Sequence, residues 1–319
     1  MKVLFKNIII LGCLIPLLTL SAKSAIPAEV RISDGQLQAY LNGKLFFACC
    51  KDPKPYLYPV YGPSGKLMVR NFPMKKVEGE ETDHPHHRGL WFTHGKVNEV
   101  DYWLEGAKQG KIIQQEIVSA VSGEKGSIKT INHWIKPDKK TVQLKEEREL
   151  QFFEKDGKWY LDINITLIPV EGDITLGDTK EGTLGFRVAE SMRVKGGLNK
   201  GHILNSNGIK DGATWSKRAE WVDYYGPVDD QIVGVAILDH PSNLRHPTWW
   251  HVRDYGLFAA NPFGIHDFEP KKDGKKTSPN EGNYLLKKDD QLTFKYRFIF
   301  HDGPSDTIDL KVEFEEYSK

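Results

Sequence analysis

The chain has 319 residues, with 44 Lys or Arg, 43 Asp or Glu and a formal net charge of +1. This balance, without any polybasic run, argues against a nucleic-acid-binding protein, because such a protein needs a basic surface to contact phosphates. A chain of this length can bury a large core without disulfide bonds.

The N-terminal segment has the pattern of a secretory signal peptide. Two lysines precede an apolar run over residues 8–20, and small residues follow it. Pro16 interrupts this run, which is shorter than the roughly 20 residues of a membrane-spanning helix. The run continues past Cys13, so we expect no lipid anchor there. We predict a signal peptide over residues 1–25, and a periplasmic or secreted protein without a membrane span over residues 26–319.

Alternation of apolar and polar residues predicts antiparallel strands in the rest of the chain. Residues 37–50 contain two such runs joined by Asn42-Gly43, a strong signal for a β-hairpin. Residues 159–168 and 292–300 alternate in the same way. Short strands separated by frequent turn residues indicate a sandwich or a barrel.

No feature of the sequence divides the chain after the predicted signal peptide. It contains no repeat of fixed period and no low-complexity linker. The tail over residues 305–317 suits a helix capped by Ser305 or Asp306, and it suits a strand equally well. We predict one all-β domain over residues 26–319, a large antiparallel β-sandwich with few short helices.

Residues 83–95, DHPHHRGLWFTHG, contain four of the eleven histidines of the chain. Pro85 favours an extended backbone at His84, so that His84, His86 and Arg88 share one side of the segment. Imidazole transfers protons near neutral pH, and guanidinium binds carboxylates or developing oxyanions. We expect this side to line a pocket for an anionic or hydroxyl-rich ligand.

Three interpretations of this histidine-rich segment remain open. His84 and His86 could be a metal-ligand pair, completed by Asp83 or His94. The same imidazoles could perform acid–base catalysis on a sugar without a metal. They could also have a structural role and bond backbone groups at a bend.

A second polar stretch lies at residues 177–191. It places Asp178 and Glu181 ahead of a predicted strand that contains Arg187. Two carboxylates can serve as acid and base at a sugar carbon when their surroundings separate their pKa values. A plain turn of solvated charges would give the same pattern.

Aromatic residues are concentrated at residues 207–226, in polar surroundings. An aromatic face can pack against the C–H face of a sugar, whereas large aromatic residues also fill β-sandwich cores. We expect some of these four residues to form a sugar-stacking wall and others to be core: Trp215, Trp221, Tyr224 and Tyr225.

A third stretch, residues 246–268, also combines histidine, arginine and tryptophan. In an extended segment His251 and Arg253 share one side, and Trp250 takes the other. Asn261 and His266 follow in a loop rich in Gly and Pro, where β scaffolds often carry ligand contacts. We expect this stretch and the histidine-rich segment to line one cleft from opposite sides.

Residues 83–103, 177–188 and 246–264 resemble an exported bacterial family catalogued as methane oxygenase PmoA. The likeness extends over nearly the whole chain after the predicted signal peptide. It implies a shared fold and export, and it carries no reaction over to this chain.

The chain also resembles, at the level of the fold, the galactose mutarotase superfold, a large β-sandwich that includes epimerases, lyases and hydrolases acting on carbohydrate. The resemblance implies that His86 or His84 matches the first histidine of the superfold and His251 the later one. Where the superfold has His-Gly-Gly, this chain has His-Arg-Gly at residues 87–89. Its partner base would be Glu181 or Glu269.

We therefore hypothesise an exported carbohydrate-active protein, most simply an enzyme for epimerisation, elimination or hydrolysis. The alternatives are a non-catalytic glycan-binding protein and a metal-dependent enzyme that uses His84 and His86. We expect no required cofactor, although a divalent metal is compatible with the sequence, and a carbohydrate or other small polar ligand. The predicted catalytic residues are His84, His86, His251 and Glu181. The predicted substrate-binding residues are His87, Arg88, Trp91, His94, Trp103, Asp178, Arg187, Trp250, Arg253, Asn261 and His266.

Overall fold

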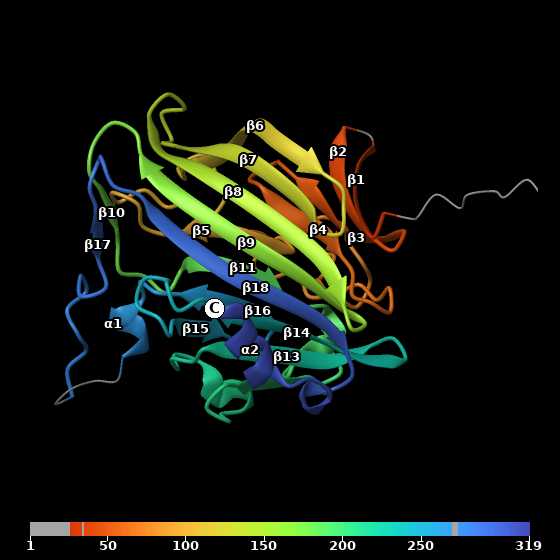
Figure 1. The fold of residues 1–319 in the computed structure, drawn as a ribbon. Coiled ribbons are helices and arrows are strands. Elements are labelled where there is room, and N and C mark those ends of the chain that lie inside the picture. The colour runs from red at the N-terminus through yellow and green to blue at the C-terminus, as the bar shows by residue number, and fades with distance from the viewer. Residues whose placement is uncertain (1–25, 34, 270–273) are drawn as a thin grey trace, which may run out of the picture.

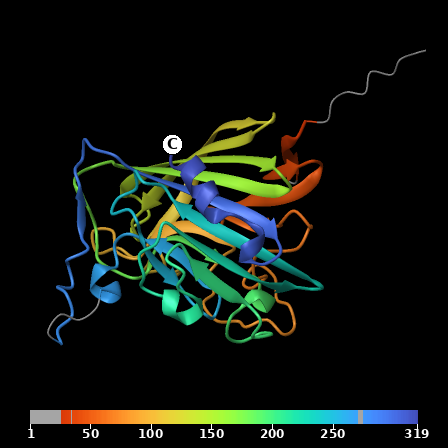
Figure 2. The ribbon, with the colours of Figure 1, turned by 60° about the horizontal axis from the view of Figure 1, so that its bottom comes forward.

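The computed structural model describes residues 26–33, 35–269 and 274–319, and the predicted signal peptide lies outside them. Two eight-stranded sheets pack face to face, as Figures 1 and 2 show. All strand pairs within the sheets are antiparallel. This architecture confirms the predicted all-β sandwich.

The first sheet begins with a meander and continues with strands from distant parts of the chain. The predicted hairpin forms at Asn42-Gly43, where both residues have positive φ, as a tight two-residue turn requires. In spatial order the sheet contains β1 (Ala28–Ser33), β2 (Gln36–Leu41), β3 (Lys44–Cys50), β4 (Tyr56–Val60), β5 (Leu90–His94), β11 (Gly182–Arg187), β16 (Leu257–Asn261) and β15 (Trp249–Val252).

The second sheet contains the longest strands. The two predicted runs at residues 159–168 and 292–300 lie in neighbouring strands, with Leu161 opposite Phe298 and Ile163 opposite Tyr296. In spatial order the sheet contains β12 (His202–Asn205), β13 (Trp221–Val228), β14 (Gln231–Asp239), β18 (Leu292–Asp302), β9 (Lys158–Pro169), β8 (Val142–Lys155), β7 (Gly126–Ile135) and β6 (Lys111–Val121).

Helices are few and short. The tail, which the sequence left open, forms α2 (Leu310–Tyr317), because the Asp309 side chain accepts a hydrogen bond from the backbone N–H of Val312. Phe314 of α2 then packs on the outer side of the second sheet. The other elements are α1 (Ile265–Phe268), the 3-10 turns η1 (Glu190–Met192), η2 (Asp211–Thr214) and η3 (Ser305–Thr307), and the small ribbon of β10 (Ile174–Leu176) and β17 (Tyr284–Leu286). Within the described ranges, no helix combines the length and apolarity needed to cross a membrane.

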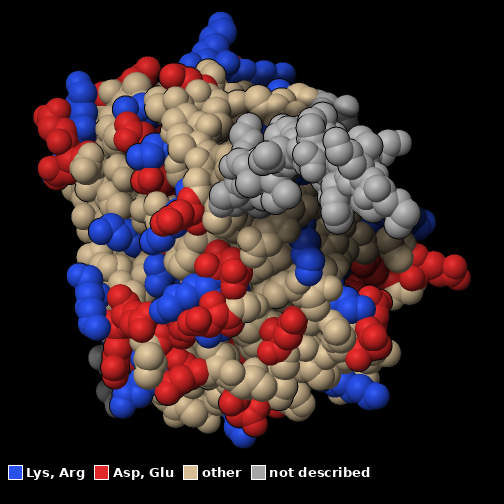
Figure 3. Space-filling view, turned by 45° about the vertical axis from the view of Figure 1, so that its right-hand side comes forward, with Lys and Arg blue, Asp and Glu red and all other residues tan. Residues whose placement is uncertain are grey.

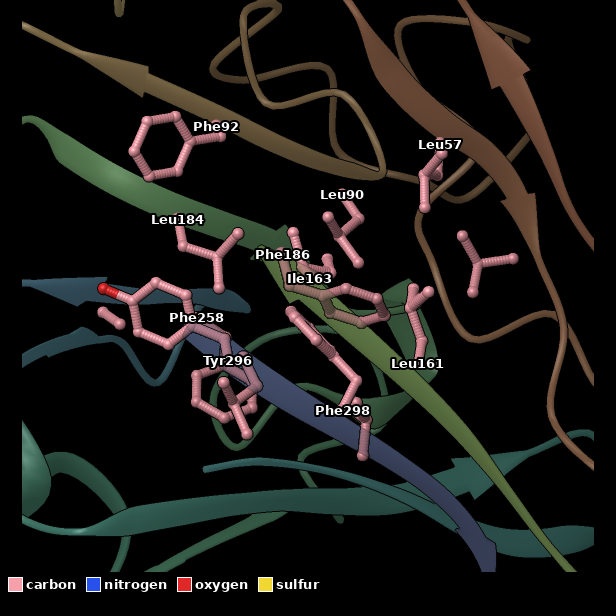
Figure 4. Packing of buried hydrophobic residues seen from close by; sticks show 14 of the residues in the cluster. Leu57, Leu90, Phe92, Leu161, Ile163, Leu184, Phe186, Phe258, Tyr296 and Phe298 are labelled. Carbon is pink, nitrogen blue, oxygen red and sulfur yellow. The ribbon is translucent and has the colours of Figure 1, made fainter. Parts of the chain in front are cut away.

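The main hydrophobic core fills the space between the two sheets. Phe186 of the first sheet contacts Phe298 and Phe300 of the second, with ring centroids 5.9 and 6.1 Å apart. Figure 4 shows these layers of apolar side chains meeting between the strands. Each such side chain contributes about 1.5–3 kcal/mol when it is fully buried.

Strands β5, β11, β16 and β15 are buried on both faces. One face packs on the core, so connecting segments must cover the other. This double burial explains why these strands are nearly continuous apolar runs instead of alternating ones. The covered outer face is where the polar stretches singled out in the sequence come together.

Candidate functional site

A row of paired residues crosses the outer face of the first sheet. Trp91 pairs with Tyr56 on one side and Gly185 on the other, and Gly185 pairs with Ala259, which pairs with His251. Three strand spacings put Trp91 and His251 roughly 14 Å apart along the row. A Cβ atom at Gly185 would lie 2.4 Å from Trp91, so the indole lies over this glycine. The row connects the histidine-rich segment with the segment that contains His251.

Aromatic rings rise from this row as a stack. His87 stacks on Trp91 with centroids 5.2 Å apart, and His84 stacks on His87 at 4.7 Å. Tyr255, from the β16–β15 turn, stacks on the far side of His84 at 5.2 Å. His86 packs edge-on against His87 at 4.5 Å. The predicted alternation of sides is wrong here, because the segment bends and brings all three imidazoles together.

Trp103 forms the underside of this ring cluster. Its indole is fully buried, 5.3 Å from Trp91 and 5.7 Å from His87. In this position Trp103 supports the histidines from below, and its buried ring is not open for the substrate contact predicted from the sequence.

The carboxylate of Asp83 holds the cluster against two buried arginines. Arg70 pairs with it directly, Arg187 lies 2.9 Å from it and His84 Nδ1 lies 2.8 Å from it. Burial raises the pKa of Asp83, but the charge of Arg187 and the hydrogen bonds from Arg70 and His84 outweigh this effect and lower the pKa to about 2. Asp83 is therefore ionised over the whole physiological range.

Arg187 also fixes the tautomer of His87. Its Nη1 lies 3.3 Å from His87 Nδ1, so the ring accepts this hydrogen bond at Nδ1 and carries its proton on Nε2. Burial and the charges of His86 and Arg187 hold the pKa of His87 well below its usual value. His87 is therefore a neutral hydrogen-bond donor.

A buried lysine lies beside His86. Lys54 Nζ donates to the carbonyl oxygens of His86 at 2.8 Å and Trp103 at 3.4 Å, and it lies 3.1 Å from the Glu105 carboxylate. Burial lowers the pKa of Lys54 to about 8, although Glu105 opposes the change. Glu105 also binds Arg88 through both carboxylate oxygens, at 2.8–3.1 Å. The guanidinium of Arg88, predicted to bind a ligand, is thus already paired.

On the other side of the row, His251 is held by a backbone group. Its Nδ1 lies 2.8 Å from the carbonyl oxygen of Lys180, so Nδ1 carries the proton and Nε2 the lone pair. Nε2 has no partner among the described residues. Burial lowers the pKa of His251 to about 4, and the charge of Glu181 partly opposes this shift.

Glu181 connects the two sides of the site electrostatically. Burial and the charge of Lys54 lower the pKa of His86 to about 4, and Glu181 acts in the opposite direction on it, as it does on His251. Glu181 also contributes to the raised pKa of Tyr255, for which burial is the largest cause. The Glu181 carboxylate itself forms an ion pair with Lys180 at 3.0 Å, next to the backbone carbonyl that holds His251.

Arg253 lies at the same end of the row as His251. Its guanidinium is 5.5 Å from the Trp215 ring and 5.4 Å from the Tyr255 ring. It makes no ion pair with a carboxylate in the described part of the chain. Arg253 is thus a cation that a ligand could neutralise.

Three predicted ligand-binding residues instead organise the loops behind the site. Asp178 accepts hydrogen bonds from the backbone N–H groups of His266 and Gly282. Asn261 Nδ2 donates to the carbonyl oxygen of Thr179 at 2.9 Å, and the His266 ring bonds a loop carbonyl at 2.7 Å. These contacts tie the loop after β10 to the loop after β16, so the three residues are engaged in holding these loops together.

Two further predicted residues face the interior. Trp250 is fully buried in the core between the sheets, and its Nε1 donates to the carbonyl oxygen of Ala219. His94 is 1% exposed, with Nε2 bonded to the Gly177 carbonyl and its ring against Phe263. Both positions are inconsistent with the predicted ligand contacts, because strand alternation turns these side chains away from the outer face.

The sequence interpretation missed residues that stabilise the cluster. Arg70 and Lys54 come from segments without histidine or tryptophan motifs, so only the three-dimensional structure connects them with the site. Glu105 follows the predicted Trp103 by two residues. Tyr255 could have been found from the sequence, because it follows His251 and Arg253 within four residues in a turn.

In the residues that the structure describes, His84 and His86, the predicted metal-ligand pair, are not joined by further ligands into a metal centre. No group of three or more His, Cys, Asp or Glu side chains in those ranges is arranged to hold an ion. His84 and His86 lie with ring centroids 5.8 Å apart, and Nδ1 of His84 is engaged by Asp83.

Comparison with family models gives one match, which covers residues 29–315 and is described as a family of unknown function, DUF6807. No curated protein matches the sequence. The comparisons give no support to the PmoA label expected from the sequence.

The solved structures that match the chain share little sequence with it. A glycoside hydrolase family 97 enzyme of Pseudoalteromonas sp. strain K8, seen in one structure with panose, is 9% identical with a TM-score of 0.36. The match covers 86% of this chain and 34% of the hydrolase, so the chain spans about a third of that protein. A galactose mutarotase-like protein of Lactobacillus casei is 9% identical with a TM-score of 0.37, and the match covers 86% of this chain and 100% of that one.

Proposed function

We propose that this chain, which belongs to DUF6807, a family of unknown function, binds and converts a carbohydrate on the outer face of the first sheet. The observation that carries this proposal is the row from Trp91 to His251, which has the histidine cluster at one end and, at the other, His251 bonded to the backbone carbonyl next to Glu181. These groups come from three distant segments and face one side of one sheet.

The proposed chemistry is proton transfer at a sugar. His251 presents the lone pair of Nε2, because its other nitrogen is held by a backbone carbonyl. The imidazolium formed there, which the negative charge of Glu181 would stabilise, would return the proton to the sugar, and His86 is the candidate second proton acceptor. His87 would donate a hydrogen bond from Nε2, and Arg253 would bind a carboxylate or developing negative charge. This division of roles is compatible with epimerisation, elimination or hydrolysis.

Substrate screening with matched variants tests the proposal. The native protein is incubated with a broad panel of saccharides, and products are followed by mass spectrometry and NMR. His86→Ala, His251→Ala and Glu181→Gln should each lower the rate on the active saccharide at least about 100-fold. His202→Ala, on an exposed strand end of the second sheet, is the control and should turn over normally. Normal turnover by His251→Ala and Glu181→Gln would remove the pair from the mechanism.

A non-catalytic glycan-binding protein is the second candidate. The pKa values of His86 and His251 are both lowered to about 4, which makes these imidazoles weak proton acceptors at neutral pH. Saccharide binding without any product across the panel would favour this candidate. Elemental analysis of the untreated protein decides the metal-dependent alternative, since stoichiometric metal that is lost in His84→Ala would support it.

We also propose that the protein is exported. This rests on the sequence pattern of residues 1–25 alone, which lie outside the described residues. Expression of the full chain should give a mature protein cleaved after Ser24 or Ala25, as read by intact mass. An uncleaved cytoplasmic product would contradict this.

A further inference from the structure

A hollow lies beside the site, where residues 216–219 hydrogen-bond the outer edge of β15. Its volume is about 460 Å³. Trp215 and Trp249 line it, and Trp215 is the more accessible of the two indoles. Trp249 is fixed by a hydrogen bond from its Nε1 to Glu269 at 2.7 Å. The hollow therefore offers aromatic surface that nothing in the proposed chemistry uses.

The hollow is continuous with the residues around His251. Trp249 and His251 are two residues apart on β15 and share its outer face, so their backbones are about 7 Å apart. The Phe268 ring lies 5.9 Å from His251 and 6.0 Å from Trp215. Arg253 lies over the Trp215 ring, 5.5 Å from its centroid. A ligand held at His251 could thus continue directly into the hollow.

The charges at the hollow are mainly positive. Its two carboxylates are engaged, since Glu269 accepts from Trp249 and Asp267 lies 3.8 Å from Lys276. The guanidinium of Arg218 bonds only carbonyl oxygens, among them that of Pro247 at 2.8 Å. Lys217 is exposed and makes no ion pair in the described ranges. With Arg253 next to it, the hollow is suited to a negatively charged ligand.

We propose that this hollow is a second sugar subsite, and that the substrate is an acidic oligosaccharide instead of a single sugar. One unit would lie at His251 and Glu181, and the neighbouring unit would stack on Trp215. A carboxylate or sulfate group of the ligand would contact Arg253, Lys217 or Arg218. This inference rests on the proposed function and adds to it the length and the charge of the substrate.

The test measures dissociation constants by calorimetry for acidic and neutral oligosaccharides of common linkages, each from the monosaccharide to the hexasaccharide. The native protein should bind acidic chains of two or more units at least about tenfold more tightly than the matching monosaccharide. Trp215→Ala should abolish this gain and leave the monosaccharide affinity unchanged. Trp215→Phe, which keeps an aromatic face, should retain most of the gain.

Two further variants separate the subsite from general effects. Tyr40→Ala on β2 is the control, because it also removes an aromatic ring that has an arginine over it: Arg31 lies 4.0 Å from the Tyr40 centroid. This variant should bind saccharides like the native protein. Lys217→Gln alters only an exposed side chain, so it should fold and should weaken binding of acidic chains alone.

The outcomes distinguish this inference from the proposed function. Equal affinity for mono- and oligosaccharides, a preference for neutral chains, or an unchanged length gain in folded Trp215→Ala would overturn the subsite. In those cases binding that depends on Glu181 and His251 would leave the proposed function intact. Binding of no saccharide by the native protein would overturn both.

Discussion

His251 is a neutral imidazole with its lone pair on Nε2 for two physical reasons. Burial disfavours its charged form, and the carbonyl of Lys180 keeps the remaining proton on Nδ1. The same burial applies to His86, where the charge of Lys54 adds to it. Neither ring therefore titrates in the range of an ordinary histidine.

This environment predicts the pH dependence of activity. If the reaction needs neutral His251, kcat/KM should fall only when the pH decreases through about 4, because its pKa is lowered to that value. We expect a flat profile between about pH 5 and 7. The measurement is kcat/KM against pH on the active saccharide. An acidic limb near 6.5, the ordinary histidine pKa, would contradict the assigned role.

Asp83 predicts a pH-dependent contribution to stability. Its pKa in the folded protein, about 2, lies below the ordinary value of 3.8, so its ionised form stabilises the fold above pH 4. This contribution should disappear as the pH falls from about 4 towards 2. Asp83→Asn should lower the free energy of unfolding by about 2 kcal/mol at pH 7, a value reduced from that of a fully buried pair because Asp83 is partly exposed.

Urea denaturation at several pH values checks this prediction. The difference between the native protein and Asp83→Asn should shrink in acid. Asp230→Asn, which breaks an exposed ion pair with Lys66, is the control and should show no measurable change. A difference that stays constant down to pH 2 would show that Asp83 acts through packing and not through its charge.

Single residues also show what sequence reasoning can reach and what it cannot. His86, His251 and Glu181 were predicted as catalytic, because their residue types suit proton transfer and lie in dense polar stretches, and these roles stay predictions. Asp178 was predicted for the same reason, yet it bonds the backbone of Gly282, 104 positions away, and supports a loop. Nothing local in the sequence distinguishes Asp178 from Glu181, because the difference lies in long-range partners.

At the level of the strands, alternation predicted β9 and β18 well, since each has one face in the core and one facing outward. It could not predict which strands become neighbours: β11 pairs with β5 and with β16, from segments far apart in the chain. That order creates the row from Trp91 to His251. A cleft shared by the histidine-rich segment and residues 246–268 was therefore predicted from residue chemistry alone. The strand order places both segments on one face of one sheet.

The row predicts a sensitive position at Gly185. An added methyl group would clash with the Trp91 indole, because a Cβ atom at this glycine would lie only 2.4 Å from that ring. Gly185→Ala should lower the free energy of unfolding by roughly 1–3 kcal/mol and should displace the His87 stack, with loss of activity. The measurements are urea denaturation and the rate on the active saccharide.

Gly212→Ala is the matched control for this substitution. A Cβ atom there meets nothing within 4 Å, so the variant should stay within about 0.5 kcal/mol of the native protein. Equal stability and activity of the two variants would show that Trp91 does not depend on contact with Gly185.

At the level of the whole molecule, one continuous set of buried side chains fills the space between the two sheets. Figure 3 shows acidic and basic side chains interspersed on one face, in keeping with the near-zero net charge. The single domain expected from the sequence stays a prediction. A single domain requires that the two sheets unfold together, because neither sheet can bury its apolar face alone.

Calorimetry tests this prediction. The protein without residues 1–25 should unfold in one transition whose calorimetric and van't Hoff enthalpies agree. Two resolved transitions would indicate that the sheets, or parts of them, are separate folding units.

The central claim is that the charge of Glu181 acts on both His86 and His251 in one site, and histidine titration by NMR tests it most directly, without any ligand. Glu181 raises the pKa of both rings, so Glu181→Gln should lower both pKa values. Lys54 lowers the pKa of His86, so Lys54→Met should raise that value and leave His251 unchanged. A Glu181→Gln protein in which only one of the two histidines, or neither, changes its pKa would contradict the shared cleft.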